Sequence, residues 1–156
     1  MLLQLEPAAE RHAALPFIES DVFPVVNGDI YCEYDFGLLA EPLARLAAGH
    51  DQAHLVLVDN PPHHPNGDFV LDAGRVAASP LAAHPARLTF SGIGVYHRAL
   101  FAHTAAGEKA PLAPLLRLAI DAGRVSGEHY AGRWEDVGTP ARLNALDEEL
   151  RQHHAA

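Results

Sequence analysis

The sequence predicts an α/β fold in which a Rossmann-like mixed sheet, mainly parallel, is flanked by helices. Three observations lead to this fold class. Apolar runs rich in β-branched residues alternate along the chain with stretches whose leucines recur at helical spacing. The first two of these runs are separated by a helical stretch, as in a parallel βαβ unit. At 156 residues the chain also has the size of one domain, which we expect to span residues 1–156.

The first third of the chain supplies two strands and the helix between them. Residues 1–16 are rich in alanine and predict a short helix. Residues 23–27 form an apolar strand that stops at a polar corner. Asp35 is suited to cap a turn of helix, and a second helix runs from Pro42 to Gly49. Residues 54–59 then predict the next apolar strand, again with a polar end.

The middle of the chain combines a shaped loop with a hairpin and a long strand. Residues 61–67 contain three prolines and a glycine, which exclude regular structure. Residues 68–76 predict a hairpin with Gly74 at a position of positive φ. Residues 86–96 predict a strand, and its interruption at residues 91–94 by two glycines indicates a bulge or a close backbone approach.

The last third contributes two helices around two short strands. Leucines at helical spacing predict a helix over residues 111–122, which Gly123 ends. Residues 125–130 and 134–137 are predicted strands, and Thr139-Pro140 begins the terminal helix. The buried stripe of that helix is expected to consist of Leu143, Leu146 and Leu150.

Composition limits the function. The chain has 11 Lys and Arg against 20 Asp and Glu, a formal net charge of -9, which argues against a nucleic-acid or anionic-membrane surface. No segment approaches the roughly twenty apolar residues that cross a bilayer, and the N-terminus lacks the pattern of a secretory signal. Cys32 is the only cysteine, which excludes an internal disulfide, so we expect a cytoplasmic protein.

Two carboxylates follow predicted strands and are candidates for a metal site. Asp29 ends the corner Asn27-Gly28-Asp29, and Asp136 lies between an aromatic strand residue and the start of the last helix. Two carboxylates brought together by the fold would suit magnesium, which prefers oxygen ligands and keeps several waters. Alternatively, both segments are turns: Asn, Gly and Asp are common turn residues, and Asp136 could help to cap the helix. The residues alone leave both interpretations open.

Histidines invite a second metal hypothesis, which the spacing does not favour. His50 and His54 would not share a helical face, and the adjacent His63 and His64 would rarely point at one ion. His64 could instead donate to a phosphate group, because Lys109 is the only lysine in the chain. A surface loop is the alternative for both of these residues.

Several motifs in order resemble the sugar-1-phosphate nucleotidyltransferase family. They are V-V-N-G-D-I-Y followed by D-F, then L-V-D-N-P with H-H-P-N-G-D-F, L-T-F-S-G-I-G-V-Y and W-E-D-V-G-T-P. The resemblance runs over about residues 14–151 and implies the fold of that family. Within the family, the H-H-x-x-G-D-F and F-S-G-I-G segments are most similar to members that act on N-acetylmuramate 1-phosphate in peptidoglycan recycling.

The resemblance implies a reaction and a set of site residues. A uridylyl group would pass from UTP to a sugar 1-phosphate, and pyrophosphate would be released. Asp29 and Asp136 would be the catalytic ligands of Mg²⁺, and Asn27 would lie beside the nucleotide. The residues that the resemblance implies for sugar contacts are Asn60, Gly67, Asp68, Gly92 and Glu108.

One part of the family pattern is missing. Members begin with a G-x-G-x-R loop, a Pro-Lys-Pro segment and a glycine-rich uridine-binding stretch, and none of these precedes Asn27 in this chain. We therefore expect an incomplete nucleotidyltransferase fold that transfers uridylyl groups poorly or not at all by itself. The alternative is a noncatalytic sugar-phosphate-binding remnant that self-associates through the exposed flank of its first strand.

Overall fold

A computed structural model describes residues 4–5, 15–77, 87–102 and 112–154 of the chain. The strands within these ranges are β1 Gln4–Leu5, β2 Val22–Asn27, β3 Ile30–Cys32, β4 Ala53–Val58, β5 Val70–Asp72, β6 Arg75–Ala77, β7 Thr89–His97, β8 Val125–His129 and β9 Trp134–Asp136. The α-helices are α2 Ala40–Ala47, α3 Leu112–Asp121 and α4 Pro140–His154, and the 3₁₀ helices are η1 Leu15–Phe17, η2 Phe36–Leu39 and η3 Arg98–Phe101. Strands and helices alternate along the chain, which confirms the predicted α/β class.

Seven of the described strands form one mixed sheet in the order β1-β2-β7-β4-β8-β6-β5. Neighbours are parallel where β1 meets β2 and where β4 meets β8, and every other pairing in this sheet is antiparallel. The mixed sheet is confirmed, but the expectation that it is mainly parallel is wrong for the pairing of neighbours. The reason is β7, which lies antiparallel between β2 and β4 and separates the two strands that the sequence joined into a parallel unit.

A second, two-stranded sheet consists of β3 and β9. The strands are antiparallel, and Ile30 pairs with Asp136. Asp29 immediately precedes β3, and its carbonyl oxygen accepts a hydrogen bond of 2.9 Å from the N–H of Val137. This small sheet therefore brings together two segments that are more than a hundred residues apart in the sequence.

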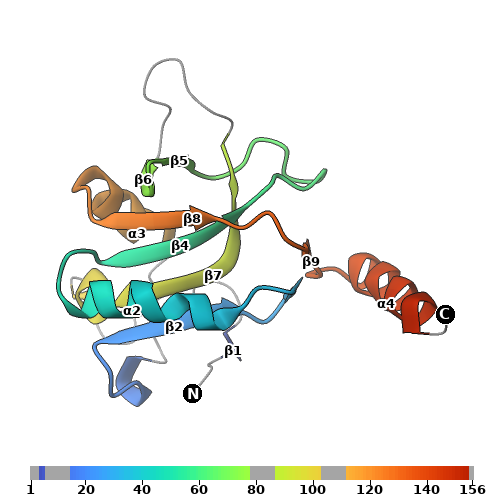
Figure 1. The fold of residues 1–156 in the computed structure, drawn as a ribbon, viewed down its shortest axis with the longest axis horizontal. Coiled ribbons are helices and arrows are strands. Elements are labelled where there is room, and N and C mark those ends of the chain that lie inside the picture. Colours follow the sequence, from blue (N-terminus) through green and yellow to red (C-terminus); the bar gives the residue numbers. More distant parts are fainter. Residues whose placement is uncertain (1–3, 6–14, 78–86, 103–111, 155–156) are drawn as a thin grey trace.

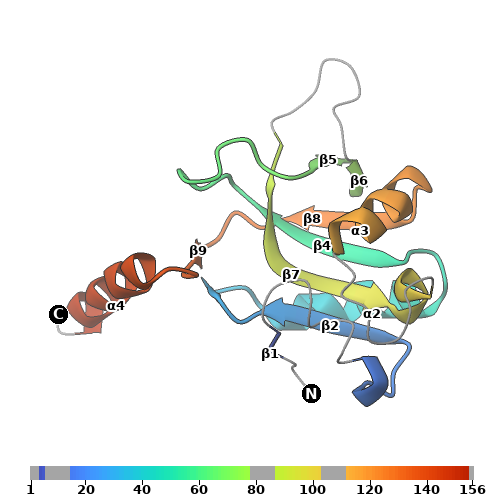
Figure 2. The same ribbon diagram turned by 180° about the vertical axis from the view of Figure 1, so that it is seen from behind.

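Helices cover both faces of the large sheet (Figures 1 and 2). Helix α2 lies on one face, where Leu46 packs in a cluster with Val56, Ile93 and Val95, all of them buried. Helix α3 and η3 lie on the other face, in the cluster that contains the buried Leu55 of β4. Because β4 and β7 are central strands with apolar residues toward both layers, they are almost completely buried.

Several turn residues behave as their types predict. Asp35 caps η2 by accepting a hydrogen bond of 2.9 Å from the N–H of Gly37. Gly49 follows α2 with a φ of 81°, and Gly123 follows α3 with a φ of 67°. The β5–β6 hairpin turns at Ala73 and Gly74, with φ of 44° and 78°, so the predicted positive φ of Gly74 is confirmed.

Three details differ from expectation. The helix predicted over residues 1–16 is wrong at Gln4–Leu5, which form a strand that pairs with β2 at Val26 and Asn27. That pairing covers part of the strand edge that we expected to be exposed. Helix α4 extends away from the large sheet (Figure 1). Leu146 is buried but Leu143 is 51% exposed, so the predicted stripe of this helix is only partly buried.

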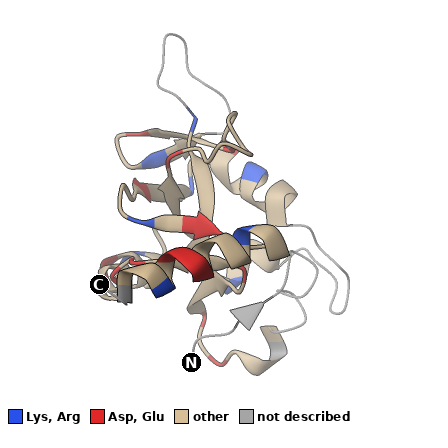
Figure 3. Ribbon diagram, turned by 90° about the vertical axis from the view of Figure 1, so that its right-hand side faces the viewer, with Lys and Arg blue, Asp and Glu red and all other residues tan. Residues whose placement is uncertain are grey.

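The charges of the described residues are dispersed. In the side view of Figure 3, acidic and basic residues are interspersed along the elements. Among the described residues, no helix has the length and apolar character that crossing a membrane requires.

Candidate active site

Asp29 and Asp136 converge above Gly138. A methyl group built on the α-carbon of Gly138 would lie 3.1 Å from Oδ1 of Asp136 and 3.2 Å from Oδ2 of Asp29. The pairing of β3 with β9 and the bond between Asp29 and Val137 hold the two backbones in this arrangement. The structure thus brings together the two carboxylates that the sequence placed at separate strand ends.

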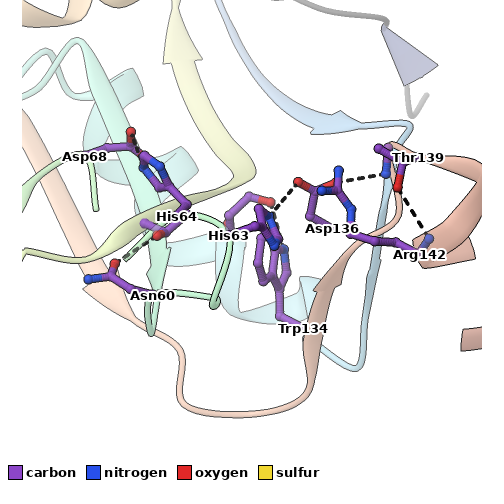
Figure 4. A network of polar contacts seen from close by, with 11 residues as sticks. Asn60, His63, His64, Asp68, Trp134, Asp136, Thr139 and Arg142 are labelled. Atoms are coloured by element: carbon purple, nitrogen blue, oxygen red, sulfur yellow. Dashed lines mark hydrogen bonds and ion pairs between the residues drawn. The ribbon is translucent and has the colours of Figure 1, made fainter. Parts of the chain in front are cut away.

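Asp136 is held by three groups (Figure 4). Its Oδ1 accepts hydrogen bonds from the N–H of Gly138 at 2.8 Å and from Nη2 of Arg142 at 2.9 Å. Its Oδ2 lies 3.2 Å from Nε2 of His63. Arg142 belongs to the first turns of α4, where Thr139 caps the helix by accepting from the N–H of Arg142 at 3.3 Å. The orientation of this carboxylate is therefore determined by β9, α4 and the loop that follows β4.

These contacts favour the ionised form of Asp136. Partial burial alone would raise the pKa of the carboxyl, because it removes water from the charged form. The hydrogen bond from Gly138 and the positive charge of Arg142, with a smaller contribution from His63, outweigh burial and lower the pKa below its usual value. Asp136 is thus an anion at neutral pH, as a magnesium ligand must be.

Asp29 differs from Asp136 in its surroundings. Its side chain is exposed, and within the described part of the chain no hydrogen bond or ion pair engages the carboxylate. The described residues include no group of three or more His, Cys, Asp or Glu side chains that could hold a metal. A cation at this position would have Asp29 and Asp136 as its protein ligands, and water or substrate oxygens would complete its shell, which is the usual situation for magnesium.

Both carboxylates line a pocket of about 280 Å³. Asn27 at the end of β2 and Gly92 in β7 also line it, and so do His63, His64 and Trp134. Gly92 has a φ of 84°, and a methyl group there would lie 2.9 Å from the side chain of Asn27. The glycine therefore allows β7 to pass close to Asn27, which explains the interruption of this strand in the sequence.

Asn60 and Gly67 form one unit that shapes the loop after β4. Nδ2 of Asn60 donates to the carbonyl oxygens of Pro65 at 3.2 Å and Arg87 at 2.8 Å, and its Oδ1 accepts from Thr89 at 2.8 Å. Gly67 has a φ of 57°, and a methyl group on it would lie 2.6 Å from Oδ1 of Asn60. The amide of Asn60 is thus used within the protein, where it ties the loop to the start of β7.

Asp68 and His64 form a pair on the same loop (Figure 4). Oδ1 of Asp68 lies 3.0 Å from Nε2 of His64, and Oδ2 accepts a hydrogen bond of 2.9 Å from the N–H of Phe90. Asp68 does not line the pocket, but His64 and Phe90 do. Glu108, the remaining residue implied for sugar contacts, lies outside the described residues, as does Lys109.

Sequence reasoning missed three contributors to this site. His63 was considered only with its neighbour His64, whereas it contacts Asp136, which is 73 positions away. Arg142 was not considered, although it lies in the first turn of α4, six positions after Asp136. Trp134 was noted only as the aromatic strand residue before Asp136, whereas it lines the pocket and its Nε1 donates to the carbonyl oxygen of Ser91 at 2.9 Å.

Solved structures with the same fold are nucleotidyltransferases that act on sugar or inositol phosphates. The chain has the fold of sugar-1-phosphate nucleotidyltransferases. A Bacillus anthracis structure described as a glucose-1-phosphate thymidylyltransferase in complex with sucrose matches with a TM-score of 0.67 at 16% identity, over 94% of this chain and 61% of that one. The inositol-1-phosphate CTP transferase of T. maritima matches with a TM-score of 0.64 at 18% identity, over 89% of this chain and 58% of that one.

One curated protein is also similar to this chain in sequence. The chain is 42% identical over 139 residues to N-acetylmuramate alpha-1-phosphate uridylyltransferase of Neisseria meningitidis serogroup B, which covers 89% of this chain and 59% of the relative. The chain therefore shares the fold of sugar-1-phosphate nucleotidyltransferases and is similar in sequence to a uridylyltransferase. The chain spans about three fifths of the length of the relatives it matches. No family model matches the sequence.

Proposed function

We propose that the chain takes part in the transfer of a uridylyl group from UTP to a sugar 1-phosphate. The observation that carries this proposal is the convergence of Asp29 and Asp136 on one pocket, beside Asn27 and Gly92. The 42% identity to a uridylyltransferase supports the nucleotide and the reaction type.

Asp29 and Asp136 are the residues that would hold a magnesium ion. They fit this ion because both provide hard oxygen ligands, because they approach one point above Gly138, and because the contacts of Asp136 favour its anion. When bound, the ion would neutralise phosphate charge during the transfer. The carboxylate of Asp136 is engaged by Arg142 and His63, so these two side chains orient the ligand for the ion.

The proposed reaction needs no covalent nucleophile from the protein. A phosphate oxygen of the sugar 1-phosphate attacks the α-phosphorus of UTP and forms the new P–O bond, while the bond from that phosphorus to the bridging oxygen breaks and pyrophosphate leaves. The chain contributes mainly position and charge. Asn27, which lines the pocket, would contact the nucleotide, and the glycine at position 92 would allow a substrate to approach the backbone of β7.

The loop residues would act on the sugar mostly through the shape of the pocket. The side chains of Asn60 and Asp68 form hydrogen bonds within the loop and to the start of β7, and Gly67 allows the loop to turn. We propose that these residues position the pocket wall around the sugar. Glu108 is proposed as a direct sugar contact from the family resemblance alone.

The sugar that we propose is N-acetylmuramate 1-phosphate, within peptidoglycan recycling. Support comes from the name of the relative from Neisseria meningitidis and from the H-H-x-x-G-D-F loop. Because UTP is a cytoplasmic metabolite, this reaction would take place in the cytoplasm.

Calorimetry on the purified chain tests the proposal. We expect N-acetylmuramate 1-phosphate and UTP each to bind more tightly with magnesium chloride than with EDTA. Binding of the sugar phosphate without any binding of UTP would favour the noncatalytic alternative. Absence of binding by both ligands, with the chain folded by circular dichroism, would contradict the proposed function. In a coupled pyrophosphate assay we expect little turnover by this chain alone.

A further inference from the structure

We propose that His64, oriented by Asp68, binds the anionic substituent of the sugar substrate. This inference depends on the proposed function, because it concerns the ligand of the same pocket. It assigns to His64 the binding of a negatively charged group of the substrate, a role separate from that of the two carboxylates assigned to the metal.

The position of Asp68 is fixed by three atoms. Its Oδ2 accepts from the N–H of Phe90 at 2.9 Å, its N–H donates to the carbonyl oxygen of Leu88 at 2.8 Å, and its carbonyl oxygen accepts from Nη2 of Arg87. Asp68 is therefore anchored to the start of β7 rather than free to follow the loop. Because His64 contacts Asp68, the position of its ring is tied to the large sheet through Asp68.

The remaining oxygen of Asp68 determines how the ring of His64 can be used. Oδ1 lies 3.0 Å from Nε2 of His64, and an ionised carboxylate can only accept, so Nε2 carries the hydrogen in this pair. Nδ1 is then the ring nitrogen left for a ligand. A protonated ring would donate from Nδ1 to an anion, and the negative charge of Asp68 on the other side would stabilise that cation.

The negative charge of the pocket means that an anionic substrate needs a positively charged side chain to bind it. An anionic substrate enters a pocket that already contains the carboxylates of Asp29 and Asp136. Of the described residues that line this pocket, His63 and His64 are the ones whose side chains can become positive. Nε2 of each faces a carboxylate, but the partner of His63 is the proposed metal ligand Asp136, whereas the partner of His64 is Asp68, which does not line the pocket. Arg142 contacts Asp136 but does not line this pocket. His64 is thus the cationic group that remains for the sugar.

Two substituents share the required chemistry. The 1-phosphate and a carboxylate on the sugar ring are both oxyanions that accept one hydrogen bond from an imidazolium. Four ligands separate them: N-acetylmuramate 1-phosphate carries both, N-acetylmuramate only the carboxylate, N-acetylglucosamine 1-phosphate only the phosphate, and N-acetylglucosamine neither.

The test measures the affinity of these four ligands, in magnesium chloride, for wild type, His64→Gln and Asp68→Asn. Asp68→Asn keeps an oxygen that can accept from Phe90, so it preserves the anchor while removing the charge behind His64. The matched control is His129→Gln, because His129 also lies 3.0 Å from a carboxylate, that of Asp59, and does not line the pocket.

We expect His64→Gln to lose about tenfold or more in affinity for ligands that carry the recognised anion, the usual size of a hydrogen bond to a charged group. Asp68→Asn should lose less, in the same ligands. A loss confined to the two phosphates, or confined to the two muramates, supports the inference and identifies the anion. Unchanged affinities overturn it, and so does an equal loss that includes N-acetylglucosamine. The proposed function survives either result as long as wild type binds sugar 1-phosphate and UTP with magnesium. If wild type binds neither ligand, both proposals fail.

Discussion

Nη2 of Arg142 lies 2.9 Å from Oδ1 of Asp136, so the first turns of α4 are joined to the end of β9 at a proposed metal ligand. Both residues are partly buried, with side-chain exposures of 34% and 29%. The contact has an electrostatic consequence, because the guanidinium is one of the groups that lower the pKa of Asp136.

We expect Arg142→Gln to raise the pKa of Asp136. In wild type the folded-state pKa is depressed, so this carboxylate contributes stability above its unfolded value of about 4, and the contribution is lost as the pH falls through the folded pKa. Without Arg142, the contribution should be smaller and its loss should be complete at a higher pH. Carbon-13 NMR titration of the carboxyl measures the change directly. Arg151→Gln removes a comparable pair with Asp147 on the same helix and should leave Asp136 unchanged. An unaltered titration in Arg142→Gln would contradict the assigned role.

Asp29→Asn and Asp136→Asn should each weaken metal binding by at least about tenfold, because each removes one of two charged ligands. Mn²⁺ can replace Mg²⁺ as a paramagnetic probe, and the bound fraction is read by electron paramagnetic resonance with UTP present. Asp147→Asn, an exposed carboxylate on α4, is the matched control and should bind as wild type does. Wild-type affinity in either site variant would remove that residue from the metal site.

Gly138→Ala tests the convergence of the two carboxylates. The added methyl group would lie 3.1 and 3.2 Å from their oxygens, closer than ordinary van der Waals contact. We expect it to push the oxygens apart and lower metal affinity, with little change in the melting temperature because Gly138 is exposed. Gly37→Ala is the control, since its methyl group would meet a single carboxylate, that of Asp35, at 3.0 Å. Unchanged metal affinity in Gly138→Ala would argue that the carboxylates do not share an ion.

The convergence of Asp29 and Asp136 could be expected from the sequence because the family resemblance paired two carboxylates that each lie at the end of a predicted strand. The order of strands could not be expected in the same way. Hydrophobic periodicity predicts a strand over residues 86–96, but both faces of the observed β7 are buried, so the pattern contains no information on its neighbours. Its position between β2 and β4 is a property of the whole sheet.

Contacts within the site were harder to foresee than its location. His63 and Asp136 are brought together by the course of a proline-rich loop, whose turns are not encoded by any period. The resemblance implies a sugar contact for Asn60, whereas its bonds to the carbonyl of Arg87 and to Thr89 show a structural use that residue type alone does not reveal.

Gly92→Ala should be strongly destabilising. Alanine at a φ of 84° costs about 1 kcal/mol, and the methyl group would lie 2.9 Å from the side chain of Asn27, which adds an overpacking cost of about 1–3 kcal/mol. Gly49→Ala is a matched control, because Gly49 has a φ of 81° but nothing within 4 Å of the added group. Urea unfolding of both variants separates the two costs. Equal losses of stability would show that β7 does not depend on close approach to Asn27.

The buried His54 predicts a pH dependence of stability unrelated to catalysis. Its side chain is 6% exposed, its Nδ1 lies 3.0 Å from Oγ of Ser126, and Nε2 has no hydrogen-bond partner in the described part of the chain. Burial is the main reason that the pKa of His54 is lowered. The unfolded chain therefore takes up a proton below about pH 6.5 that the folded chain resists, so the contribution of His54 to stability is complete above that pH and is lost as the pH falls.

We expect the free energy of unfolding of wild type to fall more between pH 7.5 and 5.5 than that of His54→Gln, by at most about 1.4 kcal/mol, the value of one pH unit below the unfolded pKa for a single group. Urea titrations at both pH values measure this difference, and comparing the two proteins cancels the other groups that titrate in this range. His129→Gln removes a partly exposed histidine and should keep the pH dependence of wild type. If His54→Gln shows the same dependence as wild type, protonation of His54 does not limit the acid stability of the fold.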